Sequence, residues 1–195
     1  MSSKRFPGKV MKEINGKKLI DIIFDVLKKT EKIKKIVVLT STNKSDDILC
    51  NHLKKQKINF FRGSLENVYQ RFFDAVDYYK VDQFVRITGD SPFINPKIIN
   101  ECIVENKSNE YDIVTNVFPR SFPIGQSVEL INSKMFKKYK NKIIKKKKFR
   151  EHITSFFYEN SSNFKIKNIY NKKNLSTLDL SINYKNDIKK LFKKN

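Results

Sequence analysis

The 195-residue chain contains few of the residues that define disulfide-rich, collagen-like or membrane-spanning proteins. It has two cysteines, five glycines, five prolines and no tryptophan. Cys50 and Cys102 lie in helix-like patterns without the spacing of metal ligands, so we expect two reduced core thiols. No apolar run approaches the length of a membrane span, and residues 1–9 lack the apolar centre of a signal peptide. We therefore expect a cytoplasmic protein without a membrane partner.

Acidic residues are scarce beside basic ones. There are 20 aspartates and glutamates against 41 lysines and arginines, which gives a formal charge of +21. Such a charge is typical of proteins that bind nucleic acids or anionic surfaces. The lysines are spread over nearly every segment, however, and no aromatic stacking platform is discernible among them. Nucleic-acid binding is therefore the least favoured function class.

Arginine is also rare, and this makes each arginine informative. A guanidinium offers a fixed bidentate fork for a phosphate or a carboxylate, which lysine cannot copy. Some of these arginines could instead pair with acids on neighbouring elements, and an arginine within a strand needs such a partner. The chain has six arginines: Arg5, Arg62, Arg71, Arg86, Arg120 and Arg150.

Apolar patterning predicts an α/β protein. A hydrophobic content of 39% suits one domain with a sizeable core. Periodicity predicts helices over 18–29, 45–56, 64–79 and 96–106, and strands over 35–40, 58–61, 83–88 and 111–116. The strands recur about 22 to 30 residues apart with a helix between each pair, as in right-handed βαβ units. The pattern thus favours a three-layer α/β/α fold with a mostly parallel, Rossmann-like sheet.

The rhythm changes after residue 117. A loop rich in proline and glycine over 118–125 is followed by a strand over 127–131 and helices over 133–142 and 149–160. A strand over 164–169 and a final helix over 184–194 complete the chain. No internal repeat and no second core are evident, so 1–195 is predicted to be a single domain in which 117–195 adds a flap or small lobe to 1–116.

One stretch of the sequence places a carboxylate where a ligand is expected. The apolar strand 83–88 ends at Gly89 and Asp90, and Asn95 with Pro96 reads as the cap and first residue of a helix. Ligands of open α/β sheets bind outside the carboxyl ends of strands, so Asp90 could hold a metal over bound phosphates. Gly89 would let the backbone come close. The alternative is an ordinary turn capped by aspartate.

Four motifs follow one another along the chain. They are Ser3-Lys4-Arg5-Phe6-Pro7-Gly8-Lys9, Phe61-Arg62-Gly63-Ser64, Arg86-Ile87-Thr88-Gly89-Asp90-Ser91-Pro92 and Arg150-Glu151-His152-Ile153-Thr154. In this order and spacing they resemble the cytidylyltransferase family of the spore coat polysaccharide type, which is related to the CMP-Kdo and CMP-sialic acid synthetases. Pro119-Arg120-Ser121-Phe122-Pro123 and Val128-Glu129 fit the same branch. The resemblance covers nearly the whole chain and implies the nucleotide-diphospho-sugar transferase type of Rossmann-like fold.

The resemblance also implies roles for particular residues. A nucleotide-binding half, 1–116, would hold CTP through Ser3, Arg5, Lys9, Arg62 and Gly89. In nucleotidyl transfer a sugar oxygen attacks the α-phosphorus and pyrophosphate leaves, so catalysis is mostly positioning and neutralisation of charge. Arg5, Lys9 and Asp90 would carry this catalysis, with Mg²⁺ bound by Asp90. A sugar-binding half, 117–195, would line the sugar through Arg120, Glu129, Arg150 and His152.

The sequence departs from that family at two places. Family members have an apolar strand before the first motif, whereas Met1 falls within this motif here, so the first central strand is expected to be missing. This implies either a misplaced initiation codon or a truncated form with an exposed sheet edge. The second metal carboxylate of the family aligns with Asn183, whose carbonyl oxygen can bind a cation but carries no charge.

The leading hypothesis is therefore a magnesium-using cytidylyltransferase that transfers CMP from CTP to an acidic sugar for a surface polysaccharide. The first alternative is a non-catalytic relative that binds a nucleotide or a sugar. The second is a basic protein that binds nucleic acid, which would show a steep salt dependence. The sequence leaves open the sugar and the quaternary state, including a homodimer.

Overall fold

The computed structural model describes residues 1, 3 and 5–192. In the first half of the chain, a hairpin and three helix–strand units follow a short 3₁₀ turn, η1 (Lys9–Met11). The elements are β1 (Glu13–Ile14), β2 (Lys17–Lys18), α1 (Leu19–Leu27), β3 (Val38–Ser41), η2 (Lys44–Asp46), α2 (Asp47–Lys55), β4 (Phe60–Gly63), α3 (Val68–Tyr79) and β5 (Gln83–Arg86).

The second half of the chain adds three strands and shorter helices. The elements are α4 (Pro96–Glu105), β6 (Ile113–Thr115), β7 (Glu129–Asn132), α5 (Ser133–Lys138), α6 (Lys140–Ile143), α7 (Lys147–Glu151), α8 (Ser155–Glu159), η3 (Ser161–Asn163), β8 (Ile166–Asn168) and α9 (Lys185–Phe192). Among the described residues, no helix is both long enough and apolar enough to cross a bilayer.

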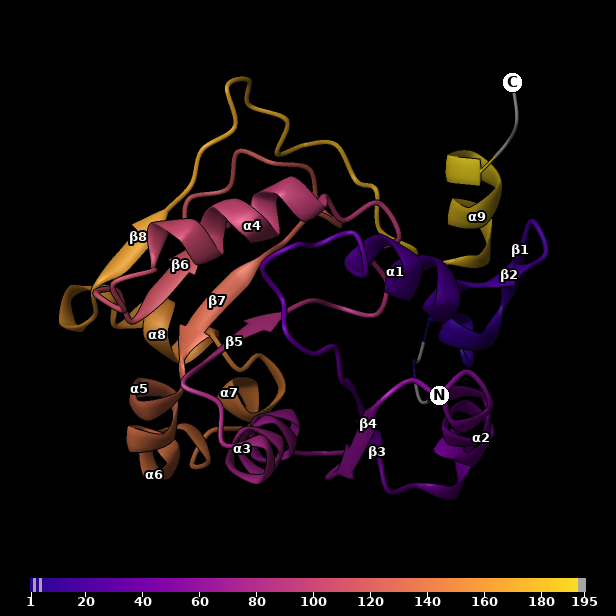
Figure 1. Ribbon diagram of the computed structural model, residues 1–195, viewed down its shortest axis with the longest axis horizontal. Coiled ribbons are helices and arrows are strands. Elements are labelled where there is room, and N and C mark those ends of the chain that lie inside the picture. The colour runs from indigo at the N-terminus through magenta and orange to yellow at the C-terminus, as the bar shows by residue number, and fades with distance from the viewer. Residues whose placement is uncertain (2, 4, 193–195) are drawn as a thin grey trace.

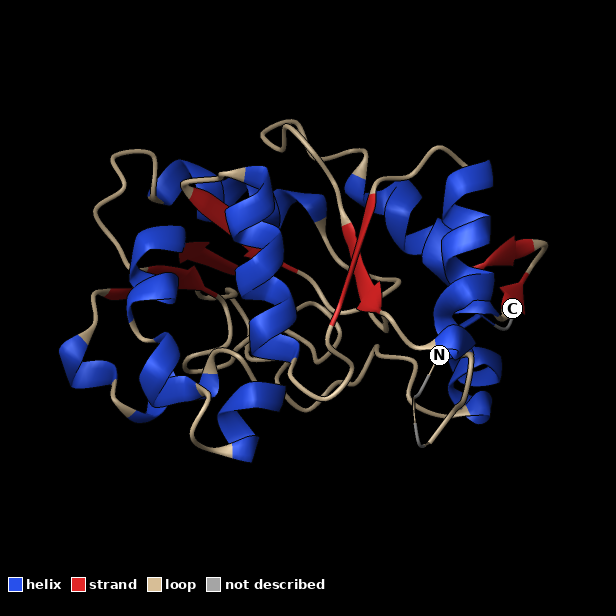
Figure 2. Cartoon of the chain, turned by 90° about the horizontal axis from the view of Figure 1, so that it is seen from below, coloured by secondary structure: helices blue, strands red, loops and turns tan. Residues whose placement is uncertain are grey.

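Two groups of strands form the middle layer. β3 and β4 pair in parallel, and a four-stranded sheet has the order β5-β7-β6-β8. Within that sheet β6 and β8 are parallel, whereas β7 runs antiparallel to both of its neighbours. Within the described part of the chain, no strand pairing joins β3 to β5. Figure 2 shows the β3–β4 pair and the four-stranded sheet as separate sets of arrows with helices around them.

Alternate residues of the central strands face different helices. Ile113 and Ile131 belong to a hydrophobic cluster with side chains of α3, α5, α7 and α8. Val114 and Leu130, one position along each strand, belong to a second cluster with side chains of α1 and α4. Since side chains alternate across a strand, this division places a helical layer on each face (Figure 1). The predicted three-layer α/β/α fold is confirmed.

Four strands end or begin together at one edge of the sheet. The last rung of the ladder aligns Arg86 with Glu129, Glu129 with Thr115, and Thr115 with Asn168. Because β7 is antiparallel to β5 and β6, its first residue lies beside their last residues. This final rung, Arg86-Glu129-Thr115-Asn168, marks the carboxyl edge at which ligands of α/β sheets bind.

Several element boundaries differ from those predicted. α3 begins at Val68 rather than at Ser64, because Asn67 is its N-cap and accepts a hydrogen bond from the Gln70 amide at 2.9 Å. The helices expected over 133–142 and 149–160 are each interrupted, giving α5 with α6 and α7 with α8. The end of the helix expected over 184–194 lies partly outside the described residues. By contrast, Asn95 caps α4 and Pro96 begins it, as predicted.

Candidate functional site

Four predicted residues from three distant segments meet beyond the end of β5. The Lys9 Nζ atom lies 3.0 Å from Asp90 Oδ2 and also donates to the Ile182 carbonyl at 2.9 Å. The Arg5 guanidinium donates to Asn183 Oδ1 at 2.9 Å. A backbone hydrogen bond from Ile182 to the Asp90 carbonyl, 2.8 Å long, holds the two loops together. We call Arg5, Lys9, Asp90 and Asn183 the Asp90 cluster.

The Asp90 carboxylate is stabilised in its charged form. Burial on its own would raise the pKa of Asp90, but the charge of Lys9 and hydrogen bonds from Thr88, Lys9 and Ser91 bring the pKa below its usual value. The side chains of Lys9 and Asp90 are 14% and 26% exposed. The loop therefore presents a partly buried anion beside two cations, all reachable from solvent.

The oxygen atoms of the Asp90 cluster suit a divalent cation that a substrate helps to bind. Mg²⁺ takes oxygen ligands, usually one or two carboxylates together with phosphate oxygens and water. Asp90 supplies one carboxylate and Asn183 one amide oxygen. Within the described residues no group of three or more histidines, cysteines, aspartates or glutamates is arranged to hold a metal. The donor set thus fits an ion that shares its coordination with a polyphosphate.

A second network occupies the final rung. Arg86 forms an ion pair with Glu129 Oε2, and Tyr158 donates to Glu129 Oε1 at 2.7 Å. Tyr158 also lies 3.3 Å from Thr115 Oγ1. Burial, followed by the charge of Glu129, raises the pKa of Tyr158 well above its usual value. Glu129 is 2% exposed with both carboxylate oxygens engaged, so in this structure it positions Arg86 and Tyr158.

Arg120 lies next to this network without a carboxylate partner among the described residues. Its guanidinium donates to the Pro123 carbonyl at 3.3 Å and to Ser127 Oγ at 2.9 Å. Burial lowers the pKa of Arg120, and the nearby charge of Glu129 partly opposes that shift. The charge of Arg86 is balanced by Glu129, whereas Arg120 makes only bonds to neutral oxygens and can accept an anionic ligand.

Comparisons with known proteins show the family to which the chain belongs. The family model described as Cytidylyltransferase matches residues 1–193. The chain belongs to the cytidylyltransferase family. An uncharacterised protein of Methanocaldococcus jannaschii is 33% identical over 165 residues, which are 84% of this chain and 66% of that protein. The spore coat polysaccharide biosynthesis protein SpsF of Bacillus subtilis is 27% identical over 172 residues, 85% of this chain and 70% of SpsF.

A solved cytidylyltransferase structure shares nearly the whole fold. The protein from Leptospira borgpetersenii superposes with a TM-score of 0.92 at 30% identity. The alignment covers 98% of this chain and 81% of the Leptospira chain. A CMP:2-keto-3-deoxy-manno-octonic acid synthetase solved with CTP has a TM-score of 0.72 at 10% identity, covering 97% of this chain and 92% of its own. That second likeness supports the fold alone. The family consists of nucleotidyltransferases, as the sequence predicted.

Arg62, Ser3 and Gly89 were also predicted to bind a nucleotide. None of them forms a hydrogen bond or ion pair with the Asp90 cluster among the described residues. Arg62 donates to the carbonyls of Ser41 and Asn43 and pairs with Asp47 at 2.7 Å. Ser3 Oγ accepts from the Phe6 amide at 3.3 Å. At Gly89 an added Cβ would make only an ordinary contact, 3.6 Å from a Val10 carbon atom, so packing within the chain does not require glycine there.

The remaining two predicted sugar residues lie at the end of α7. Arg150 has its Nε atom buried without a partner among the described residues. His152 is exposed and follows the helix, and its backbone amide donates to Lys148 at 2.9 Å. In the part of the chain that is described, no hydrogen bond joins either side chain to the final rung. Their contact with a sugar stays a prediction.

Sequence reasoning missed three residues that shape the site. Tyr158 and Asn168 reach the final rung from segments far along the chain, and no spacing pattern connects them to Glu129. Gly125 has a φ of 90°, and an added Cβ would lie 2.8 Å from backbone atoms of Leu180 and Ser181. Its combination with Pro123 marked a turn but gave no indication of the close approach of residues 180–181.

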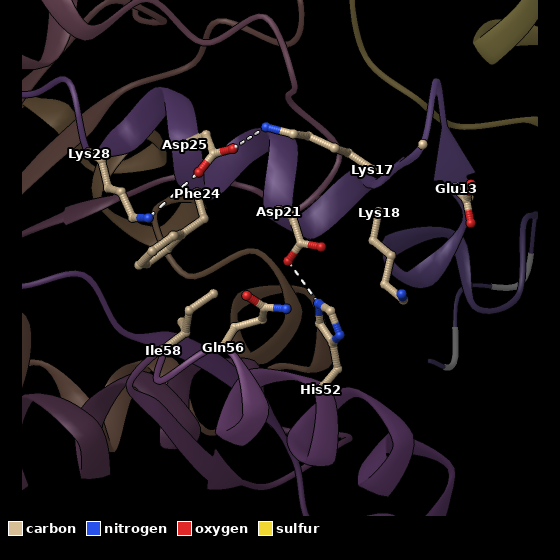
Figure 3. A pocket seen from close by; sticks show the side chains of 11 residues that line it. Glu13, Lys17, Lys18, Asp21, Phe24, Asp25, Lys28, His52, Gln56 and Ile58 are labelled. Atoms are coloured by element: carbon tan, nitrogen blue, oxygen red, sulfur yellow. Dashed lines mark hydrogen bonds and ion pairs between the residues drawn. The ribbon is translucent and has the colours of Figure 1, made fainter.

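A separate pocket of about 370 Å³ lies between α1, the β1–β2 hairpin and α2 (Figure 3). His52 Nε2 lies 2.8 Å from Asp21 Oδ1, and Asp25 pairs with Lys17 at 2.9 Å. The side chain of His52 is only 12% exposed. Its partner Asp21 belongs to α1, so the pair joins α1 to α2, and this explains the burial of His52. None of the predicted site residues lines this pocket.

Proposed function

We propose that this protein transfers CMP from CTP to a carboxylated sugar in the synthesis of a surface polysaccharide, with Mg²⁺ as its cation. The single observation that carries this proposal is the Asp90 cluster, in which two cations, a carboxylate and an amide oxygen meet at the carboxyl edge of the sheet. The chain spans 66% of the length of one relative and 70% of the length of another. We therefore propose the reaction, its substrates and its cation on the basis of the site.

The geometry supports distinct tasks for the residues of the Asp90 cluster. Lys9 and Arg5 would bind phosphate oxygens of CTP and offset the charge that grows as pyrophosphate leaves. Asp90 and Asn183 would hold the cation, which supplies Lewis-acid polarisation of the phosphates when bound. Lys9 now pairs with Asp90, so binding of a magnesium nucleotide would exchange this internal pair for two pairs with the substrate.

The sugar side of the proposal rests on Arg120 and on the names of the relatives. Arg120 is a half-buried guanidinium bound to neutral oxygens, and a carboxylate would complete its coordination. Relatives with 24–34% identity over 96 to 142 residues are named 3-deoxy-manno-octulosonate cytidylyltransferases. An eight-carbon keto acid of this kind carries the carboxylate that Arg120 lacks, and we propose a substrate of this class.

The test is pyrophosphate release from CTP with Mg²⁺ and a panel of acidic and neutral sugars that includes 3-deoxy-manno-octulosonate. We expect release with an acidic sugar and a loss of about 10² to 10³-fold in the Asp90→Ala variant. Asp25→Ala is the matched control, because it removes a carboxylate that pairs with a lysine in the separate pocket. Equal turnover by both variants would exclude Asp90 from the reaction.

Calorimetry with CTP and Mg²⁺ separates this enzyme from the non-catalytic alternative. Asn183 in place of a carboxylate is the observation that favours that alternative. Tight CTP binding without turnover of any sugar in the panel would establish a binding protein, whereas turnover would exclude one.

A further inference from the structure

Phe118 offers an aromatic surface beside the final rung. It is one of the large apolar side chains that remain exposed, at 37%. Its ring stacks on Tyr158 with 4.7 Å between centroids and 13° between planes. Tyr158 covers one face of the Phe118 ring, so a ligand can stack on this ring only from the opposite face. Single exposed aromatic residues are common, so position and rigidity decide whether this one has a task.

The ring is held more firmly than a surface side chain requires. The Phe118 amide donates to Asn168 Oδ1 at 2.9 Å, and Asn168 Nδ2 donates to the Pro119 carbonyl at 3.0 Å. Tyr158, beneath the ring, is fixed by its hydrogen bond to Glu129. Two members of the final rung therefore hold this aromatic pair: Glu129 binds the Tyr158 hydroxyl, and Asn168 binds the backbone of Phe118 and Pro119. Such fixed groups lose little conformational freedom when a ligand binds.

The positively charged Arg120 follows Phe118 in the same turn of the chain. Val117 and Arg120 form a backbone bridge that encloses Phe118 and Pro119. Phe118 and Arg120 therefore belong to the same tight turn at the carboxyl edge. Arg120 has no carboxylate partner among the described residues. The loop is also bonded to segments near the Asp90 cluster, since the Leu180 amide donates to the Ile124 carbonyl at 2.9 Å and the Gln126 side chain donates through Nε2 to the Phe93 carbonyl at 2.9 Å.

We propose that Phe118 is a stacking platform for the apolar ring face of the acceptor sugar and sets the sugar specificity of the site. A pyranose has hydroxyl groups around its rim and a face of C–H bonds, which packs on the electron-rich face of an aromatic ring. Phe118 would bind this face while Arg120 binds the carboxylate. The two contacts fix the ring plane and its direction, and so orient the attacking hydroxyl. This inference rests on the proposed function, because it assumes that the acceptor is a carboxylated sugar.

The kinetic test compares three substitutions at one position. Phe118→Leu keeps apolar bulk without an aromatic face, Phe118→Ala removes both, and Phe118→Tyr keeps the face. We expect the KM for 3-deoxy-manno-octulosonate, or for whichever acidic sugar the wild type turns over, to rise about three- to tenfold in the Leu and Ala variants. The KM for CTP should not change, and Phe118→Tyr should restore the sugar KM. Tyr78→Ala removes an exposed ring from α3 and is the control.

A binding measurement keeps the inference independent of turnover. Saturation-transfer NMR with the same sugars, in the presence of CTP and Mg²⁺, should carry magnetisation from aromatic protons to ring C–H protons in the wild type and lose it in Phe118→Leu. Transfer to a sugar without pyrophosphate release would refute the proposed function and leave the platform intact. An unchanged sugar KM in a folded Phe118→Leu variant, or no aromatic transfer to any sugar in the panel, would overturn the platform.

Discussion

In the free protein, Lys9 and Asp90 should each satisfy the charge that the other's proposed ligand, a cation or a phosphate, satisfies in the bound protein. We predict that the two side chains are energetically coupled in the free protein and uncoupled when CTP and Mg²⁺ are bound. The perturbations are Lys9→Met, which keeps the apolar stem of the side chain, and Asp90→Asn, which keeps its shape. Lys9 also donates to the Ile182 carbonyl, and a double-mutant cycle removes this separate contribution from the measured coupling.

The expected magnitude follows from distance and burial. At 3.0 Å between Lys9 Nζ and Asp90 Oδ2, an effective dielectric constant of ~20 gives a Coulomb attraction of about 5.5 kcal/mol. Desolvation of two charges that are mostly buried offsets much of this attraction. Exposed pairs contribute ~0.2–1 kcal/mol, so a coupling of about 1–2 kcal/mol is expected for this partly buried pair.

The assay is denaturant unfolding of the wild type, both single variants and the double variant at low ionic strength. A matched cycle at Lys17 and Asp25, whose side chains are 63% and 43% exposed, should give a smaller coupling. The Lys9→Met variant should also bind Mn²⁺ alone more tightly than the wild type, because Asp90 then lacks its cation, and bind CTP more weakly. A Lys9–Asp90 coupling below about 0.3 kcal/mol, within the error of additivity, would refute the reasoning.

Three further predictions concern single residues. Gly125→Ala should destabilise the fold by about 1–3 kcal/mol in denaturant unfolding, because the new Cβ meets the Leu180–Ser181 backbone at 2.8 Å. Gly16→Ala is the control and should lower the unfolding free energy less, because the space around Gly16 is open. Equal losses in the two variants would contradict this explanation. Asp46→Asn should cost about 2–3 kcal/mol near neutral pH, since the Asp46 carboxylate accepts from Thr40 at 2.6 Å and from Ser41. Burial opposes the charged form of Asp46, but the Met1 α-ammonium and the bonds from Thr40 and Ser41 lower its pKa from 3.8. Its contribution is therefore complete above that value and is lost as the pH falls towards the folded pKa. Unfolding free energies from pH 7 to 3 should show a larger acid loss in the wild type than in the variant. Asn183→Asp should strengthen Mn²⁺ binding several-fold in a titration, and identical titrations would remove residue 183 from the cation site.

The elements with strong local signals were predictable. The cap Asn95 followed by Pro96 fixed the start of α4, because a side-chain acceptor and a preset φ both act within one turn. The Ile-Val-Val-Leu run anticipated β3 although its exact limits differ. The β1–β2 hairpin was missed, although Asn15 and Gly16, both with positive φ, carry a recognised hairpin signal between very short strands.

The amino-acid sequence by itself determined the family, the α/β alternation and the residue types of the Asp90 cluster, because ordered motifs and local periodicity are properties of the chain. Only the tertiary structure decided which of those residues meet. It brought Lys9 to Asp90 and Arg5 to Asn183, and it paired Glu129 with Arg86 in a buried ion pair. The physical reason is that β7 enters the sheet antiparallel between β5 and β6, which aligns Arg86 with Glu129 through strand register, a long-range pairing that no local pattern encodes.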